Sequence, residues 1–166
     1  MDDSYNSYSR KQLDDLFLKM IAYYGGDPKR IQHFVKVHSF ARIIAVGEQM
    51  DEGSLFILEA AAYTHDIGIK PAEEKYGQCD GKLQEQEGPI VAQKMLSELG
   101  FENYLIERIC YLIGHHHTYT NVDGLDYQVL IEADFLVNLY EDDANRSAIM
   151  KAYENIFRTQ TGRKIF

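Results

Sequence analysis

A helical spacing of apolar residues along nearly the whole chain constrains the fold more than any other feature. The first such stretch contains Leu13, Leu16, Phe17, Met20 and Ile21, which lie three and four positions apart and so share one helix face. No segment shows the paired alternation of apolar and polar residues that is typical of β-strands. The spacing therefore predicts an all-α protein, a compact helical bundle of about six to seven helices.

Capping residues, glycines and prolines divide this pattern into segments. The expected helices begin at Ser9 (with Gln12 completing a capping box), Asp27-Pro28, Ser54, Pro89, Asn103 and Asp126, and a seventh covers about 146–158. Gly25-Gly26 and Gly100 are expected to end two of them. Residues 69–88, which contain Pro71 and three glycines, are expected to form a long loop, and long loops in compact domains are often functional.

Length and charge narrow the class of protein. At 166 residues the chain predicts a flexible N-terminus (1–8) and one domain (9–166). A net charge of −9 disfavours binding to a nucleic acid polymer, because phosphate backbones require clustered cations. The two cysteines, Cys79 and Cys110, are too few for a disulfide framework. The chain has neither an apolar run of membrane-spanning length nor a signal-peptide pattern, so we expect a cytoplasmic protein that does not bind membranes.

Histidines are the strongest sign of chemistry. The chain has six, each in or at the end of a predicted helix: His33, His38, His65, His115, His116 and His117. Asp66 directly follows His65, and imidazole and carboxylate groups are both good ligands for a catalytic metal. Each histidine alone is more often a core or boundary residue, but together with Asp134 they suggest a metal site between helices.

Helical geometry limits which histidines can share that site. His33 lies on one face with Val37 and Ala41, whereas His38 is rotated by about 140° and should point elsewhere. Three consecutive histidines fan out by about 100° per residue, so only one or two of residues 115–117 can face one point. The alternative is a polar run at a helix C-terminus, where a protonated imidazole suits the helix dipole.

Asp134 has apolar neighbours and is a candidate buried carboxylate, which requires a cation or several hydrogen-bond donors. Glu132 is the nearby competitor for that role. A surface position for either residue is the simpler alternative.

Two segments carry a resemblance to a known family. Residues 30–41, with Arg30, His33, Val37 and Ala41, resemble the first motif of the HD-domain superfamily of metal-dependent phosphohydrolases. Residues 63–68, which contain His65-Asp66, resemble its naming motif, and the likeness covers about 30 to 140. The resemblance implies an all-helical fold and one divalent metal ion (Mn, Fe, Co, Ni, Zn or Mg) held by His33, His65, Asp66 and Asp134.

Some members of that superfamily hold a second metal. Glu87, before Gly88-Pro89, stands where those members have a histidine, and glutamate can also bind such ions. His116 is the best candidate at the end of the following helix, with His115 and His117 as rivals. Lys70 resembles a phosphate-binding lysine, although Ile69 separates it from the His-Asp-x-Gly motif.

The resemblance implies hydrolysis of a phosphate ester or anhydride in a small phosphorylated compound, with nucleotides first. A metal in such a site activates water, Asp66 would orient or deprotonate it, and His116 or His117 would assist the leaving oxygen. Lys70, Arg30 and Lys36 are the candidates for phosphate contact. A di-iron oxygenase and a non-catalytic metal- or nucleotide-binding module are the alternatives, and a homodimer is left open.

Overall fold

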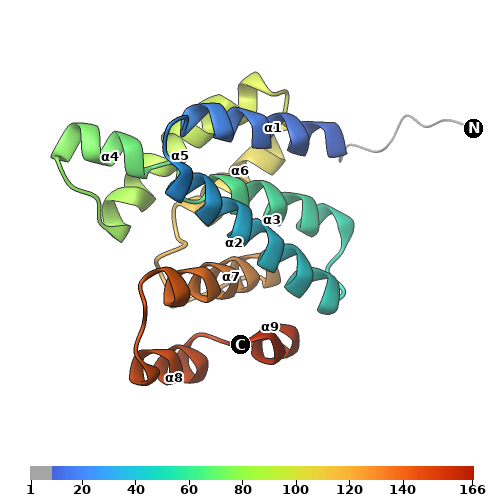
Figure 1. The fold of residues 1–166 in the computed structure, drawn as a ribbon. Helices are drawn as coiled ribbons and strands as arrows, with labels where there is room; N and C mark the ends of the chain where they lie inside the picture. The colour runs from blue at the N-terminus through green and yellow to red at the C-terminus, as the bar shows by residue number, and fades with distance from the viewer. Residues whose placement is uncertain (1–8) are drawn as a thin grey trace, which may run out of the picture.

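The computed structural model describes residues 9–166, so the expected flexibility of residues 1–8 lies outside the described residues. Within them the chain is entirely helical apart from turns, which confirms the all-α class (Figure 1). The helices are α1 (Arg10–Tyr23), α2 (Pro28–Gly47), α3 (Glu52–Thr64), α4 (Ile69–Tyr76), α5 (Gly81–Glu98), α6 (Asn103–Ile113), α7 (Leu125–Glu141), α8 (Arg146–Asn155) and α9 (Gln160–Ile165).

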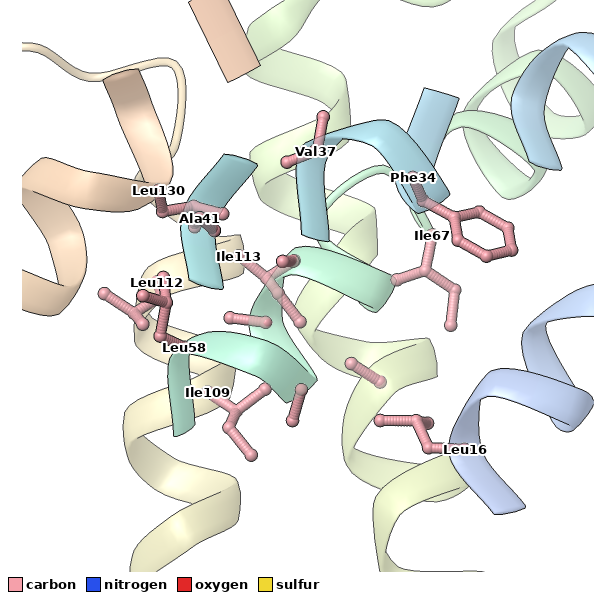
Figure 2. Packing of buried hydrophobic residues seen from close by; sticks show 14 of the residues in the cluster. Leu16, Phe34, Val37, Ala41, Leu58, Ile67, Ile109, Leu112, Ile113 and Leu130 are labelled. Carbon is pink, nitrogen blue, oxygen red and sulfur yellow. The ribbon is translucent and has the colours of Figure 1, made fainter. Parts of the chain in front are cut away.

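Helices α2, α3 and α7 pack against one another at the centre of the bundle, and α6 also packs on α3. Helix α1 covers α3, α5 lies beside α6, and α4 packs on α5 (Figure 1). Figure 2 shows the apolar core between them, where side chains such as Val37, Leu58, Ile109 and Leu130 are fully buried. Burying these apolar faces provides the main driving force for assembling the helices.

Some predicted helix starts hold and others do not. Asp27 caps α2 by accepting a hydrogen bond from the Arg30 backbone N–H, with Pro28 in the first turn. Ser9 precedes α1 without a side-chain cap, and the side chain of Gln12 donates to the Gly100 carbonyl instead. Asp51, rather than Ser54, caps α3.

The expected loop over residues 69–88 is wrong, because α4 and the first half of α5 occupy it. Gly77, in the left-handed conformation at φ 67°, ends α4, and Asp80 caps α5 by accepting from the Leu83 N–H. Pro89 lies inside α5 rather than at its start. In this part of the chain Gly77 and Gly81 lie at helix ends, whereas Gly88 and Pro89 lie inside α5 and do not mark a boundary.

Close packing explains two glycines in and next to this segment, Gly81 and Gly68. A Cβ atom on Gly68 would lie 2.5 Å from the Gln84 carbonyl oxygen and 2.7 Å from the Gly88 nitrogen. A Cβ on Gly81 would lie 2.8 Å from Cγ of His117. Residues without side chains thus let α5 fit between the turn after α3 and the histidine segment after α6.

The last helix, α9, was not predicted. The carboxylate of Glu132, fully buried on α7, accepts hydrogen bonds from the backbone N–H groups of Arg158 and Thr159 and from the Thr159 hydroxyl. Thr159 in turn caps α9. Glu132 therefore has a structural role, and this leaves Asp134 as the carboxylate available to a metal site. Among residues 9–166, no helix combines the length and apolarity needed to cross a membrane.

Candidate metal centre

Four predicted ligands from three parts of the bundle meet at one point. His33 comes from α2, His65 and Asp66 from the turn that follows α3, and Asp134 from α7. The Nε2 atom of His33 lies 3.2 Å from Nε2 of His65. The same atom lies 3.2 Å from one carboxylate oxygen of Asp66 and 3.2 Å from one of Asp134.

His65 completes this arrangement from the interior. Its Nε2 atom lies 3.5 Å from Oδ2 of Asp66 and 3.4 Å from Oδ1 of Asp134. Its other ring nitrogen, Nδ1, donates a hydrogen bond to the Ala62 carbonyl at 2.9 Å, since a carbonyl can only accept. The bond fixes the ring so that Nε2 faces the cluster, the arrangement typical of histidine ligands.

The turn that carries Asp66 is held by the end of α1. The Tyr24 hydroxyl donates to the backbone carbonyl of Asp66 at 2.7 Å. The neighbouring Tyr23 hydroxyl donates to the Ile67 carbonyl at 3.1 Å. Two side chains from α1 therefore fix the backbone from which the Asp66 carboxylate projects.

The charges in the cluster are strongly coupled. Burial favours the neutral form of His65, but the carboxylates of Asp66 and Asp134 outweigh it and raise the pKa of His65 to about 9. Burial also opposes ionisation of Asp66 and Asp134, yet the surrounding imidazoles hold both carboxyl pKa values well below their usual range. The centre is thus a set of ionised carboxylates whose neutralising charge comes from imidazolium in the absence of a metal.

Two buried atoms support a cation at this point. Among the described residues, Oδ1 of Asp134 and Nε2 of His116 are buried and make no well-formed hydrogen bond, although Oδ1 of Asp134 lies 3.2 Å from Nε2 of His33 and Nε2 of His116 lies 3.5 Å from Asp66. Each atom has a lone pair that can bind a cation. A buried lone pair that has neither a cation nor a good hydrogen bond lowers the stability of the fold. The donor types, imidazole nitrogen and carboxylate oxygen, suit a divalent transition metal.

The histidine segment after α6 contributes a second group of donors. His116 is fully buried, and its Nε2 atom lies 3.5 Å from Oδ1 of Asp66. Its Nδ1 atom donates to the Ile113 carbonyl at 2.7 Å, so Nε2 faces the cluster as it does in His65. Asp66, His116 and His117 form one group that could hold an ion, beside the group of His33, His65 and Asp66. Asp66 belongs to both.

The other two histidines of the run differ. His115 stacks on Tyr111 at 4.1 Å and its Nδ1 donates to the Tyr111 carbonyl, so it belongs to the packing of α6. Nε2 of His117 is hydrogen-bonded to the side-chain oxygen of Gln84 at 3.0 Å. Burial and the neighbouring His116 lower the pKa of His117 to about 4, which keeps its ring neutral near pH 7.

The structure does not bring Glu87 to either group. Its buried carboxylate pairs with the Lys75 ammonium and accepts from the Tyr76 hydroxyl at 3.1 Å. Both partners lie on α4, in the segment that was expected to be a loop. The resemblance that made Glu87 a candidate ligand concerned its position before Gly88-Pro89, and that position carries no sign of its pairing with α4.

The three basic candidates for phosphate contact also have partners. Lys70 is exposed, with its ammonium 5.0 Å from the Tyr23 ring centroid and outside the pocket above the cluster. Arg30 pairs with Asp27 and Glu73. Lys36 pairs with Glu141 at 2.7 Å.

His38 points away from the cluster, as helical geometry predicted. Its ring stacks on Tyr63 at 4.1 Å, and its Nε2 atom lies 2.9 Å from the buried Glu59 carboxylate. Arg10 and Arg42 also pair with Glu59. This second charged cluster joins α1, α2 and α3 and accounts for His38 without a metal.

A pocket of about 300 Å³ opens above the first donor group. Several of its residues were not predicted; the lining consists of Asp27, Lys29, Arg30, His33, Asp66, Ile69, Gln84, His117, Asn138, Glu141 and Asp142. Glu141 is the most informative, because its carboxylate accepts a hydrogen bond from Nδ1 of His33 at 2.8 Å. Its spacing of seven from Asp134, which places both on one face of α7, was the available signal.

The fold and site together define a helical bundle with an interior centre of imidazole and carboxylate donors. Residues 30–152 match the HD domain family, and the chain belongs to that family. It is also similar to the crystal structure of a predicted HD superfamily hydrolase from an uncultured Thermotogales bacterium. That similarity has 28% sequence identity and a TM-score of 0.62, and covers 95% of this chain and 82% of the other. A comparison with curated proteins found no match. The family and the donor cluster support a metal-dependent hydrolase of the HD superfamily.

Proposed function

We propose that this protein hydrolyses phosphate ester or anhydride bonds in small phosphorylated compounds, with nucleotides as the first class to test. A divalent cation would be held by His33, His65, Asp66 and Asp134. The observation that carries the proposal is that these donors meet beneath an open pocket: His33, His65 and Asp66 form one possible metal-binding group, and Oδ1 of Asp134 lies 3.2 Å from Nε2 of His33. A second cation beside Asp66 and His116 is part of the same proposal.

The pocket favours a small and hydrophilic substrate. Among the described residues that line it, Ile69 is the only apolar one. Four carboxylates face two cationic side chains, Lys29 and Arg30, so the lining has a surplus of negative charge. The negative lining would repel a phosphate group, and the positive charge of a bound cation would offset this repulsion and attract the phosphate.

The chain's own residues then divide the remaining work. A divalent cation in this set of ligands supplies charge to the phosphoryl oxygens and makes water a better nucleophile. The carboxylate of Asp66 faces both donor groups, which is where a water proton would have to be accepted. We propose that Nε2 of His116 hydrogen-bonds the leaving oxygen when no second cation occupies that atom, because the low pKa of His117 keeps that ring neutral near pH 7 and so a weak acid.

The test is phosphate release from a panel of mononucleotides, dinucleoside polyphosphates, cyclic dinucleotides and sugar phosphates. Mn²⁺, Fe²⁺, Co²⁺, Ni²⁺, Zn²⁺ and Mg²⁺ are supplied separately to metal-free protein. Asp66→Ala should reduce turnover by several powers of ten, while His38→Ala, whose ring contacts Glu59 instead, should retain it. Release from no compound with any metal, or full activity in Asp66→Ala, would refute the proposal.

The oxygenase alternative needs a mixed carboxylate-histidine set of ligands, and the ion pair between Glu87 and Lys75 argues against Glu87 as a member of that set. Oxygen uptake by the iron-loaded protein in the same experiment would restore it. Nucleotide binding without turnover would instead favour the binding module.

A further inference from the structure

His33 is held at both of its ring nitrogens by residues of one helix. Its Nε2 atom faces Asp134 at 3.2 Å, and its Nδ1 atom lies 2.8 Å from a carboxylate oxygen of Glu141. Both acidic residues lie on α7, two helical turns apart. Because a carboxylate can only accept a hydrogen bond, Nδ1 must carry a proton to pair with Glu141, and once a cation occupies the cluster the lone pair of Nε2 is free to bind it.

Glu141 is itself anchored. Its second carboxylate oxygen pairs with the Lys36 ammonium at 2.7 Å, and its side chain is only 13% exposed. Lys36 and His33 lie one turn apart on α2, so the carboxylate is inserted between two side chains of that helix. This restricts the Glu141 carboxylate to a position from which it can orient the imidazole.

The place of Glu141 in α7 needs an explanation of its own. It is the last residue of the helix and is followed by Asp142 and Asp143. A carboxylate at a helix C-terminus is disfavoured by the helix dipole, which prefers cations there. The hydrogen bond to His33 and the ion pair with Lys36 offset this unfavourable interaction with the helix dipole and explain why an acidic residue occurs at this position.

The other two buried imidazoles are oriented differently. Nδ1 of His65 and Nδ1 of His116 each donate to a backbone carbonyl, those of Ala62 and Ile113. His33 instead donates to a charged side chain. A carboxylate partner makes an imidazole a stronger metal ligand than a neutral carbonyl does, and losing such a partner typically weakens metal binding by 10–100-fold.

We propose that Glu141, restrained by Lys36, is a positioning residue that fixes the Nδ1–H form of His33 and strengthens Nε2 as a metal ligand. The proposal rests on the metal centre of the proposed function. It assigns a role in metal affinity to a pair of residues that need not touch substrate.

The experiment measures Mn²⁺ affinity of the metal-free, full-length protein from the EPR signal of free Mn²⁺. Glu141→Ala should bind roughly 10–100-fold more weakly. Glu141→Gln should lose less, because the amide oxygen still accepts from Nδ1, and Lys36→Met should show a smaller loss than Glu141→Ala. Asp143→Asn is the matched control: it removes one negative charge at the same helix end, from an exposed side chain, and should keep wild-type affinity.

A second readout follows the imidazole directly. In Zn²⁺-loaded protein labelled with ¹⁵N at histidine, the His33 signals should report a proton on Nδ1 in the wild type, hydrogen-bonded to a carboxylate, and should lose the signature of that hydrogen bond in Glu141→Ala. If Glu141→Ala does not fold, Glu141→Gln and Lys36→Met carry the test. Wild-type affinity in all three variants, or an equal loss in Asp143→Asn and Glu141→Gln, would overturn the role of Glu141. A wild type that binds no Mn²⁺ would overturn the metal centre itself, whereas metal binding without phosphate release would count only against the proposed reaction.

Discussion

Replacing Gly68 with alanine should destabilise the protein even though its backbone tolerates any residue. Gly68 has φ −74° and ψ −13°, an ordinary right-handed helical conformation, so glycine is not required for backbone freedom. The constraint is space. An added Cβ would lie 2.5 Å from the Gln84 oxygen, 2.7 Å from the Gly88 nitrogen and 2.9 Å from the Gly88 Cα.

All three contacts involve backbone atoms of α5, so no side-chain rotation can relieve them. Helix α5 or the turn after Asp66 must move until each contact exceeds about 3.4 Å. Overpacking of this kind costs about 1–3 kcal/mol. For a protein of this size, each kcal/mol lowers the melting temperature by about 2–4 °C, so we expect a fall of roughly 2–12 °C.

Calorimetry of metal-free wild type and Gly68→Ala would measure this change. The control is Gly25→Ala, an exposed position where the nearest neighbouring atom, the Ala22 oxygen, would lie 3.3 Å from the Cβ. The displaced turn also carries Asp66, so Mn²⁺ affinity should fall in Gly68→Ala and not in Gly25→Ala. A melting temperature within about 1 °C of wild type in Gly68→Ala would show that the packing argument is wrong.

Three further predictions concern the histidines. His33→Ala should lose metal, measured as ions per chain after reconstitution, whereas His38→Ala should retain it; the reverse pattern would identify the wrong histidine as a ligand. The pKa of His65 is raised to about 9 without metal, so metal binding near pH 7 must displace a proton, and metal affinity should rise about tenfold per pH unit toward pH 9. Over the same range the metal-free protein should lose the contribution of the protonated His65 to its stability. Calorimetric titration of metal in buffers of different ionisation enthalpy would detect the released proton. His116→Ala should lower turnover and weaken binding of any second metal. His115→Ala should mainly lower the melting temperature, because its ring no longer packs on Tyr111. Equal activities in the two variants would contradict the role proposed for His116.

The sequence predicted the parts of the fold that depend on local interactions. The α2 start is an example, because Asp27 and Pro28 act on their own helix. It failed over residues 69–88, where two of the three glycines serve contacts between elements: Gly88 lies against Gly68, and Gly81 against His117. Such contacts depend on the positions of several helices and leave no local pattern to distinguish them from turn signals.

The site shows the same division. The convergence of His33, His65, Asp66 and Asp134 could be predicted because the residue types and motifs restrict their chemistry. The ion pair of Glu87 could not, since its partner Lys75 comes from α4, in a segment expected to be a loop. Glu141 was missed because its role depends on an ion pair across two helices.

The hydroxyls of Tyr23 and Tyr24 hold the backbone around Asp66, and both tyrosines precede residue 30, where the match to the family begins. The segment that matches the family is therefore shorter than the structural unit that holds the metal centre in position. A chain trimmed to residues 30–152 would retain every proposed ligand but would lose the two tyrosine hydroxyls that fix the backbone at Asp66. Boundaries for excising or grafting this domain should accordingly be drawn from its hydrogen bonds rather than from its family signature.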